Sequence, residues 1–173
     1  MQMPEMETKR SLIRATCQAD GSACLDIWLD DEMGKYMADP PRDKADEDTL
    51  NFAVGIENQD GWYPMVVIHK ATGDFLGTCS IVPVDDEKRW DLGYTVHKNY
   101  WRQGYGTEII QKLIELWKEN GIVSFSASVA KENAASNALL KKLGFLVWKD
   151  TESFKKRNTN IIYPKYTYIL KVQ

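Results

Sequence analysis

A glycine-containing turn runs directly into the most strongly amphipathic helical pattern of the chain, and this junction constrains the fold more than any other feature. From Ile109 to Trp117, apolar residues recur at i, i+1, i+4, i+5 and i+8, with charged and polar residues between them. Gly104 and Gly106 precede the pattern, and Gly121 follows it at a position typical of a helix C-terminus. The sequence therefore predicts a helix that buries one face and begins at a tight turn.

The segments on either side alternate between strand-like and helix-like patterns. A four-residue connection containing Gly73 joins two β-rich runs and indicates a hairpin. After Gly121 the chain reads as strand, helix and strand, with Gly144 ending the helix. Strands are predicted over 11–16, 63–70, 75–84, 90–97, 122–129, 145–149 and 163–172, and further helices from 19–20 to about 37, over 49–57 and over 133–143. These elements predict an α+β protein with a mixed sheet.

Length and charge limit the class of protein. With 173 residues the chain is long enough for one domain with a real core, so we expect a single domain over residues 1–173, with residues 1–8 as a flexible tail. Lys and Arg total 22 and Asp and Glu total 25, a net charge of −3. Such a chain has no general attraction for polyphosphate backbones, so we expect no nucleic-acid partner.

Targeting segments and metal-ligand clusters are not evident in the sequence. Apolar runs are about as long as residues 65–68, far below the roughly 20 residues that span a bilayer, and residues 1–10 contain no apolar signal-peptide region. We therefore expect a cytoplasmic protein with no membrane partner. Cys17, Cys24 and Cys79 form no Cys-x-x-Cys pair, and His69 and His97 have no carboxylate at ligand spacing, so neither a disulfide framework nor a metal site is expected.

The turn around Gly104 and Gly106 has the properties of an anion-binding site. Glycines allow a ligand to approach the backbone closely, and the first amides of the following helix, with its positive dipole end, attract a phosphate. A dinucleotide-binding fingerprint would need a small residue at Ile109, and a P-loop would need Gly-Lys-Ser/Thr, so both are excluded. The alternative is that the two glycines only shape a strand-to-helix turn.

Three segments around this turn resemble the GNAT superfamily of acetyl-CoA-dependent N-acetyltransferases. They are Leu92-Gly93-Tyr94-Thr95-Val96, then Tyr100-Trp101-Arg102-Gln103-Gly104-Tyr105-Gly106-Thr107-Glu108, then Glu132-Asn133-Ala134-Ala135-Ser136-Asn137 running into Lys142-Leu143-Gly144-Phe145. Within the superfamily, the chain most resembles the branch of ribosomal-protein N-terminal alanine acetyltransferases. The resemblance is specific over residues 90–145 and implies a mixed, mostly antiparallel central sheet of about six to seven strands flanked by about four helices.

The resemblance also implies where acetyl-CoA, the acetyl donor, would bind. Backbone groups of Tyr94, Thr95 and Val96 would pair with the pantetheine arm as an added strand does. The backbone amides of the turn would hold the pyrophosphate, with the side chain of Arg102 adding charge; the turn residues are Arg102, Gln103, Gly104, Tyr105, Gly106 and Thr107. One position departs from the pattern, because Trp101 stands where many members carry Arg or Gln. A side-chain phosphate contact is therefore not expected at Trp101.

Two polar residues at the next helix start carry further expectations. Asn133 is predicted to be an N-cap and, by the resemblance, also to contact the coenzyme. Ser136 matches the hydroxyl that lies near the thioester sulfur in the family, where it would donate a proton to the departing thiolate. Because a thiol of pKa about 8.5 is a tolerable leaving group, this donor need contribute only about one order of magnitude.

The base is the least defined element of the expected site. An α-amine with pKa near 8 is roughly a tenth neutral at pH 7, whereas a lysine amine near 10.4 is about 0.04% neutral, so an α-amine needs less help. Asp91 matches a position where many relatives carry a carboxylate, and it could deprotonate the amine directly or through water. The alternatives are that Asp91 is a solvated strand-edge acid and that His97 is the base.

Two further groups of residues are candidates for the acceptor site. The resemblance places the acceptor wall in the first third of the chain, which contains Trp28, Tyr36, Phe52, Trp62 and Tyr63. Trp28 and Phe52 are predicted to be core residues. The basic cluster Lys155–Arg157 is predicted to be a solvated hairpin tip without a site.

The sequence thus predicts an enzyme that passes an acetyl group from acetyl-CoA directly to a primary amine. The acceptor stays open among a protein N-terminus, a polyamine, an amino acid and an aminoglycoside-like antibiotic. The alternatives are a coenzyme A-binding sensor or interaction module on the same fold, and an α+β domain without a ligand. Monomer and homodimer are equally open.

Overall fold

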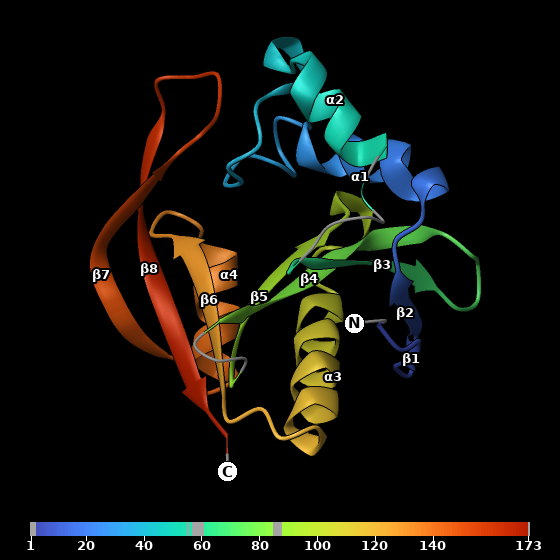
Figure 1. The fold of residues 1–173 in the computed structure, drawn as a ribbon, viewed down its shortest axis with the longest axis vertical. Coiled ribbons are helices and arrows are strands. Elements are labelled where there is room, and N and C mark those ends of the chain that lie inside the picture. Colours follow the sequence, from blue (N-terminus) through green and yellow to red (C-terminus); the bar gives the residue numbers. More distant parts are fainter. Residues whose placement is uncertain (1–2, 55, 57–60, 85–87, 173) are drawn as a thin grey trace.

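The strands of the protein form one mixed sheet in the computed structural model, which describes residues 3–54, 56, 61–84 and 88–172 (Figure 1). Within these residues the sheet has eight strands in the order β1-β2-β3-β4-β5-β6-β8-β7. They are β1 (Met6–Glu7), β2 (Ser11–Ala15), β3 (Tyr63–His69), β4 (Phe75–Val84), β5 (Arg89–Val96), β6 (Ser124–Ala130), β7 (Leu146–Lys155) and β8 (Ile162–Lys171). Neighbouring strands are antiparallel except for β5 and β6, which are parallel.

Helices lie on both faces of the sheet. They are α1 (Gly21–Trp28), α2 (Glu47–Val54), α3 (Tyr105–Glu119) and α4 (Ala134–Lys142). The indole of Trp28 in α1 donates to Thr78 Oγ1 on β4 at 3.1 Å, and Thr78 Oγ1 lies 2.7 Å from Thr95 Oγ1 on β5. Tyr94, the neighbour of Thr95, points instead toward Ser136 of α4. Because successive side chains of a strand point to opposite faces, α1 and α4 cover opposite faces of the sheet.

The sheet opens in its middle, between β5 and β6. Arg89, Trp90 and Asp91 pair with 124–126, and within the described chain the pairing stops there. Beyond this point the two strands diverge, as Figure 1 shows for the green β5 and the orange β6. The fold therefore creates an opening in the sheet, with α3 and α4 beside it.

The main core lies between the sheet and the apolar face of α3. Ile109, Ile110 and Leu113 are fully buried, as the helical pattern predicted, and Trp117 packs on Trp90 with ring centroids 4.2 Å apart. Such burial of large apolar side chains stabilises a fold by about 1.5–3 kcal/mol for each side chain. The helix begins at Tyr105 and is followed by the predicted left-handed glycine.

The predicted class and mixed sheet are confirmed, and the described sheet has one strand more than the predicted six to seven. Several boundaries differ. The first helix was expected to reach residue 37 but α1 ends at Trp28, because Asp30 Oδ1 accepts the amides of Glu32 and Met33 and so favours turns. Residues 55 and 57 of the helix expected over 49–57 lie outside the described residues. In the described part of the chain, no helix is long and apolar enough to span a bilayer.

Residues 3–8 contact the sheet and the core, and residues 1 and 2 of the flexible tail expected over 1–8 lie outside the described part of the chain. Met6 lies in β1, which pairs with β2, and both Met3 and Met6 are buried in the main core. The reason is the apolar character of the two methionine side chains, which contact the core although the exposed Pro4 and Glu5 between them interrupt any apolar pattern in the sequence.

Candidate active site

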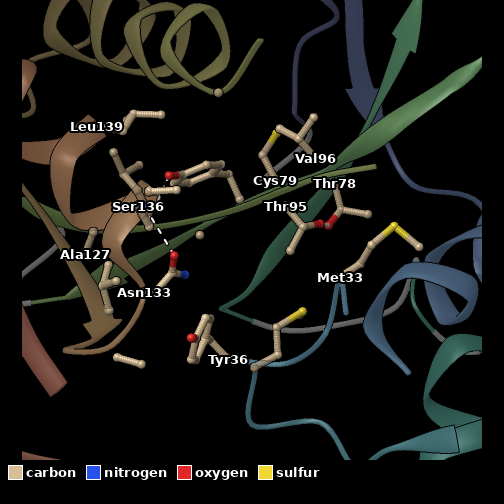
Figure 2. A pocket seen from close by; sticks show the side chains of 18 of the residues that line it. Met33, Tyr36, Thr78, Cys79, Thr95, Val96, Ala127, Asn133, Ser136 and Leu139 are labelled. Carbon is tan, nitrogen blue, oxygen red and sulfur yellow. Dashed lines mark hydrogen bonds between the residues drawn. The ribbon is translucent and has the colours of Figure 1, made fainter. Parts of the chain in front are cut away.

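A cleft of about 1030 Å³ occupies the opening between β5 and β6. It is lined by β4, β5, the start of α3, β6 and the start of α4, and on the other side by the segment that connects α1 and α2. Figure 2 shows Ser136 and Leu139 of α4 on one side and Met33 and Tyr36 of the connecting segment on the other. The cleft therefore has two differently built sides.

The backbone of β5 presents hydrogen-bonding groups to this cleft. Val96 lies opposite Gly77, and the amide of His97 donates to the carbonyl of Leu76, so Val96 belongs to a non-hydrogen-bonded pair. The alternation of an antiparallel ladder then directs the backbone groups of Val96 and Tyr94 away from β4 and toward the opening. The backbone of Thr95 faces β4 instead, and only its side chain reaches the cleft.

The turn before α3 has an unusual backbone. Arg102 and Gly104 both have positive φ, 59° and 85°. Gly104 is the N-cap of α3 and provides no side-chain cap, so helix geometry leaves the amides of Tyr105, Gly106 and Thr107 without intrahelical acceptors. Such a helix start is suited to binding an anion.

The second glycine of the turn has a packing role. A Cβ at Gly106 would lie 2.8 Å from Leu139 Cδ1 and 3.2 Å from the ring of Tyr94. Glycine at this position thus allows the start of α3 to approach β5 and α4 closely. The two glycines meet different requirements, a left-handed backbone at Gly104 and a close approach at Gly106.

A residue far away in sequence holds this turn, and no local pattern predicts its role. Arg10, just before β2, donates to the carbonyl of Gln103 at 2.9 Å and pairs with Glu108 at 2.7 Å. Its guanidinium carbon also lies 3.9 Å from the ring centroid of Tyr105. Arg10 and Glu108 are 98 residues apart, so a local motif cannot reveal the contact.

We expect Arg10→Ala to lower the free energy of unfolding by about 1–2 kcal/mol, because it removes a partly buried, charge-assisted network. Urea denaturation measures this change. Arg42→Ala is the matched control, since Arg42 pairs with Asp26 on an exposed surface and should cost at most about 0.5 kcal/mol. Equal losses in both variants would contradict a special role for Arg10.

Trp101 lines the cleft, and its hydrogen bond is to the backbone. Its indole Nε1 donates to the carbonyl oxygen of Val96 at 2.6 Å. The ring thereby joins the turn to the end of β5. The departure from the family pattern thus gives this chain a direct link between the two backbone elements of the cleft.

The start of α4 and the strand β5 bring two hydroxyl groups together in the cleft. Asn133 is the predicted N-cap, and its side chain accepts the amide of Ser136 at 3.3 Å. Ser136 Oγ lies 2.9 Å from the phenol oxygen of Tyr94. Burial raises the pKa of Tyr94 above its usual value, with the Ser136 hydrogen bond opposing this shift. The phenol therefore stays protonated at neutral pH and can donate to Ser136.

Asn137 of α4, for which the sequence predicted no role, also holds the start of this helix in place. Its side-chain amide donates to the carbonyls of Ala130 and Asn133, at 3.0 and 2.8 Å, and its Oδ1 accepts the phenol of Tyr168 at 2.7 Å. These bonds tie the start of α4 to β6 and β8.

Asp91 lies at the last paired position of β5 and β6. Its Oδ1 accepts the hydroxyl of Ser126 at 2.7 Å. Burial raises the pKa of Asp91, while the Ser126 hydrogen bond and the charges of Lys165 and Arg89 oppose the rise. Asp91 is thus a half-buried, hydrogen-bonded carboxyl rather than the solvated edge acid considered as its alternative. Its side chain is not among the described residues that line the cleft, whereas Ser128 and Lys165 of the same face are.

The other predicted residues divide between the cleft and its surroundings. His97 caps the short turn after β5 by accepting the amide of Asn99. Trp28 is buried as predicted, but Phe52 is 37% exposed, contrary to the predicted core position, because it stacks on Trp62 at the rim of the cleft. All the predicted coenzyme contacts line the cleft except Gln103, and Ser136 lines it too. The predicted coenzyme contacts and Ser136 are therefore brought together from three separate sequence segments.

Comparison with known proteins identifies the family of the chain that forms this cleft. The model of the acetyltransferase (GNAT) domain matches residues 10–146. The chain belongs to the GNAT acetyltransferase family, as its motifs predicted.

One similar sequence and two similar structures illustrate the relationship. The uncharacterized N-acetyltransferase p20 of Bacillus licheniformis is 29% identical over 149 residues, which cover 83% of each chain. RimL, described as a ribosomal L7/L12 alpha-N-protein acetyltransferase, superposes with a TM-score of 0.79 at 16% identity and covers 98% of this chain and 94% of its own. The microcin C7 self-immunity acetyltransferase MccE, solved with acetyl-CoA and AMP, gives 0.77 at 18% identity, with 95% and 93% covered. At these identities the two structures establish a shared fold.

Proposed function

We propose that this protein is an acetyl-CoA-dependent N-acetyltransferase that moves an acetyl group directly to a primary amine, a protein N-terminus or a small amine. We further propose that residues 1–173 form a single domain with this activity. One observation carries the proposal: the unpaired backbone edge of β5 and the start of α3, which follows a turn with two glycines, line the same cleft.

The residues of the cleft fit coenzyme A. The backbone groups of Tyr94 would pair with the amides of the pantetheine arm, as an added strand does. Val96 would contribute its amide alone, because its carbonyl oxygen already accepts the indole of Trp101. The amides of 105–107 would hold the pyrophosphate, with charge from Arg102, and Asn133 would add a contact from α4. Thr95 would contribute its side chain. Acetyl-CoA, when bound, supplies an acetyl group activated as a thioester.

Val96 and Asp91 would assist the attack of the amine on the thioester, Val96 at the carbonyl oxygen and Asp91 at the amine. The amide of Val96 points to the opening and would donate to the carbonyl oxygen on which negative charge develops. Asp91 would accept the proton of the amine through water, because its side chain lies behind the surface of the cleft. Its raised pKa makes the carboxylate a stronger base than an exposed aspartate.

Ser136 and Tyr94 would deliver the proton that the leaving thiolate needs. Ser136 Oγ would donate to the sulfur, and the phenol of Tyr94, 2.9 Å away, would hold the hydroxyl in place and could replace its proton. Tyr94 thus adds a second hydroxyl to the single donor that the sequence motif suggested.

The test of the proposed function is the melting temperature with and without acetyl-CoA, followed by an amine panel. At about one hundred times Kd, binding should add roughly 2.7 kcal/mol, a rise of about 5–10 °C. Thiol release is then measured with peptides bearing free N-terminal alanine or serine, spermidine, amino acids and an aminoglycoside. A melting shift without thiol release would favour the coenzyme-binding module, and no shift would remove the coenzyme site.

We expect Ser136→Ala to lower kcat about tenfold while the acetyl-CoA melting shift stays unchanged. Tyr94→Phe is the matched variant, because it keeps the ring that packs on Gly106 and removes only the hydroxyl. Its kcat should fall less than that of Ser136→Ala. Unchanged turnover in Ser136→Ala would remove this serine from the mechanism.

A further inference from the structure

The tip of the β7–β8 hairpin, residues 155–160, is largely exposed as the sequence predicted, but one of its lysines is buried. Lys156 is only 6% exposed. Its ammonium donates to the carbonyl oxygen of Gly34 at 2.8 Å and to that of Met37 at 3.1 Å. The prediction of a solvated tip was therefore wrong at this residue, because the connection between α1 and α2 folds over it.

Other residues of the tip bind the same connecting segment. The amide of Arg157 donates to the carbonyl of Ala38 at 2.9 Å, and its guanidinium donates to Asp39 Oδ1 at 3.0 Å. The side-chain amide of Asn158 donates at 2.9 Å both to the carbonyl of Lys44 and to Asp46 Oδ2. The tip is therefore bonded along the segment 34–46, from just after its first turns to the start of α2.

This segment builds the side of the cleft that faces α4. Tyr36, Met37 and Asp39 line the cleft, and Figure 2 shows Tyr36 across from Ser136. Between α1 and α2 the segment contains only turns and one short 3-10 helix, so its own backbone does little to fix its position. The ring of Tyr36 packs edge-on against Tyr163 of β8, at 5.6 Å between centroids.

We propose that Lys156 is a positioning residue for the amine acceptor: by holding the carbonyls of Gly34 and Met37, it fixes the wall carrying Tyr36 and Met37 against which the amine is placed. This inference rests on the proposed function. The coenzyme contacts proposed above lie on β5, α3 and α4, so Lys156 should affect the acceptor and not the coenzyme.

The energetics favour a fixed wall over a loose contact. A buried ammonium needs acceptors, and the two carbonyls supply them, while Asp39 and Asp31 provide nearby negative charge. Burial nevertheless lowers the pKa of Lys156, which indicates that the group is held at some cost in hydration. If residues 34–37 moved away, the ammonium of Lys156 would lose both carbonyl acceptors, so its hydrogen bonds oppose such a movement.

The test uses two adjacent lysines of opposite burial. Lys156→Met removes the buried ammonium and keeps an unbranched apolar side chain of similar volume, and Lys155→Met makes the same change at an exposed neighbour. With the best amine of the panel, we expect the amine KM of Lys156→Met to rise about tenfold. Its KM for acetyl-CoA and its acetyl-CoA melting shift should match the wild type, and Lys155→Met should match it throughout. An unchanged amine KM, or an equal rise in both substrates' KM values, would overturn the proposal.

A second measurement keeps the inference separate from the proposed function. Hydrogen–deuterium exchange of the amides of 34–46 needs no turnover, and we expect faster exchange confined to this segment in Lys156→Met. If the wild type acetylates no amine, the proposed function has failed, and unchanged exchange in this segment would then overturn the role of Lys156 as well. Should Lys156→Met not fold, Lys156→Gln replaces it, because its amide can still donate one hydrogen bond.

Discussion

Replacing Gly104 with valine is expected to remove most of the melting-temperature rise that acetyl-CoA produces. Gly104 has φ of 85°, a conformation that costs a β-branched residue at least about 1–2 kcal/mol, so the turn would relax and move the amides of 105–107. Losing about two charge-assisted hydrogen bonds to the pyrophosphate corresponds to roughly 3 kcal/mol, or about a hundredfold in Kd. Calorimetric titration of acetyl-CoA measures this directly.

The same helix provides a control for Gly104. Gly121 follows the other end of α3 with φ of 86°, and no heavy atom lies within 4 Å of an added Cβ. Gly121→Val should therefore lower the melting temperature of the free protein comparably but leave the acetyl-CoA shift intact. Gly104→Asn should bind better than Gly104→Val, because asparagine tolerates this conformation. Equal coenzyme affinity in both valine variants would mean that the turn is only structural.

The second large effect is expected for Asp91→Asn. We expect kcat/KM for the amine to fall about a hundredfold, the lower part of the range for a general base, with an unchanged acetyl-CoA melting shift. Asparagine retains an acceptor for Ser126, so the pair of β5 and β6 should stay intact. A kcat/KM within about threefold of the wild type would exclude Asp91 as the base.

The pH dependence tests the same residue independently. Activity should fall as the pH drops through the raised pKa of Asp91, because only the carboxylate accepts a proton. Ser126→Ala removes a hydrogen bond that lowers this pKa, so the acidic limb of the pH profile should move to higher pH. A folded-state pKa above the unfolded value means that Asp91 lowers stability once it is ionised, and this cost disappears at low pH. Asp91→Asn should thus raise the urea midpoint at pH 8 but not at pH 3.

Local patterns predicted the elements of this fold well where one signal dominated. The helical period and its flanking glycines located α3, and the two β-rich runs on either side of Gly73 located β3 and β4. The end of α1 was missed, because the side chain of Asp30 competes with the helix for backbone amides. β7 runs to Lys155, well beyond the predicted residue 149, because pairing with β8 extends a strand whose own pattern is weak.

In the candidate site, too, residues in short-range motifs could be predicted and residues that act through long-range contacts could not. The turn at Gly104 and the cap at Asn133 are short-range features with their own sequence signals. Arg10 and Lys156 contact their partners over 98 and 122 residues, and nothing in the neighbouring sequence marks either as buried or bridging. Positions of this kind depend on the complete fold, so they could not be predicted from the sequence.

The divergence of β5 and β6 gives the sheet more edges than its strand order suggests. Besides the outer edges at β1 and β7, the described strands have two inner ones, where β5 continues past Asp91 and β6 past Ser126. Edges of this kind can capture any extended peptide, which makes them starting points for aggregation. Whatever occupies the opening therefore also protects the chain from self-association, so the lifetime of the protein in a cell would follow the concentration of its ligand.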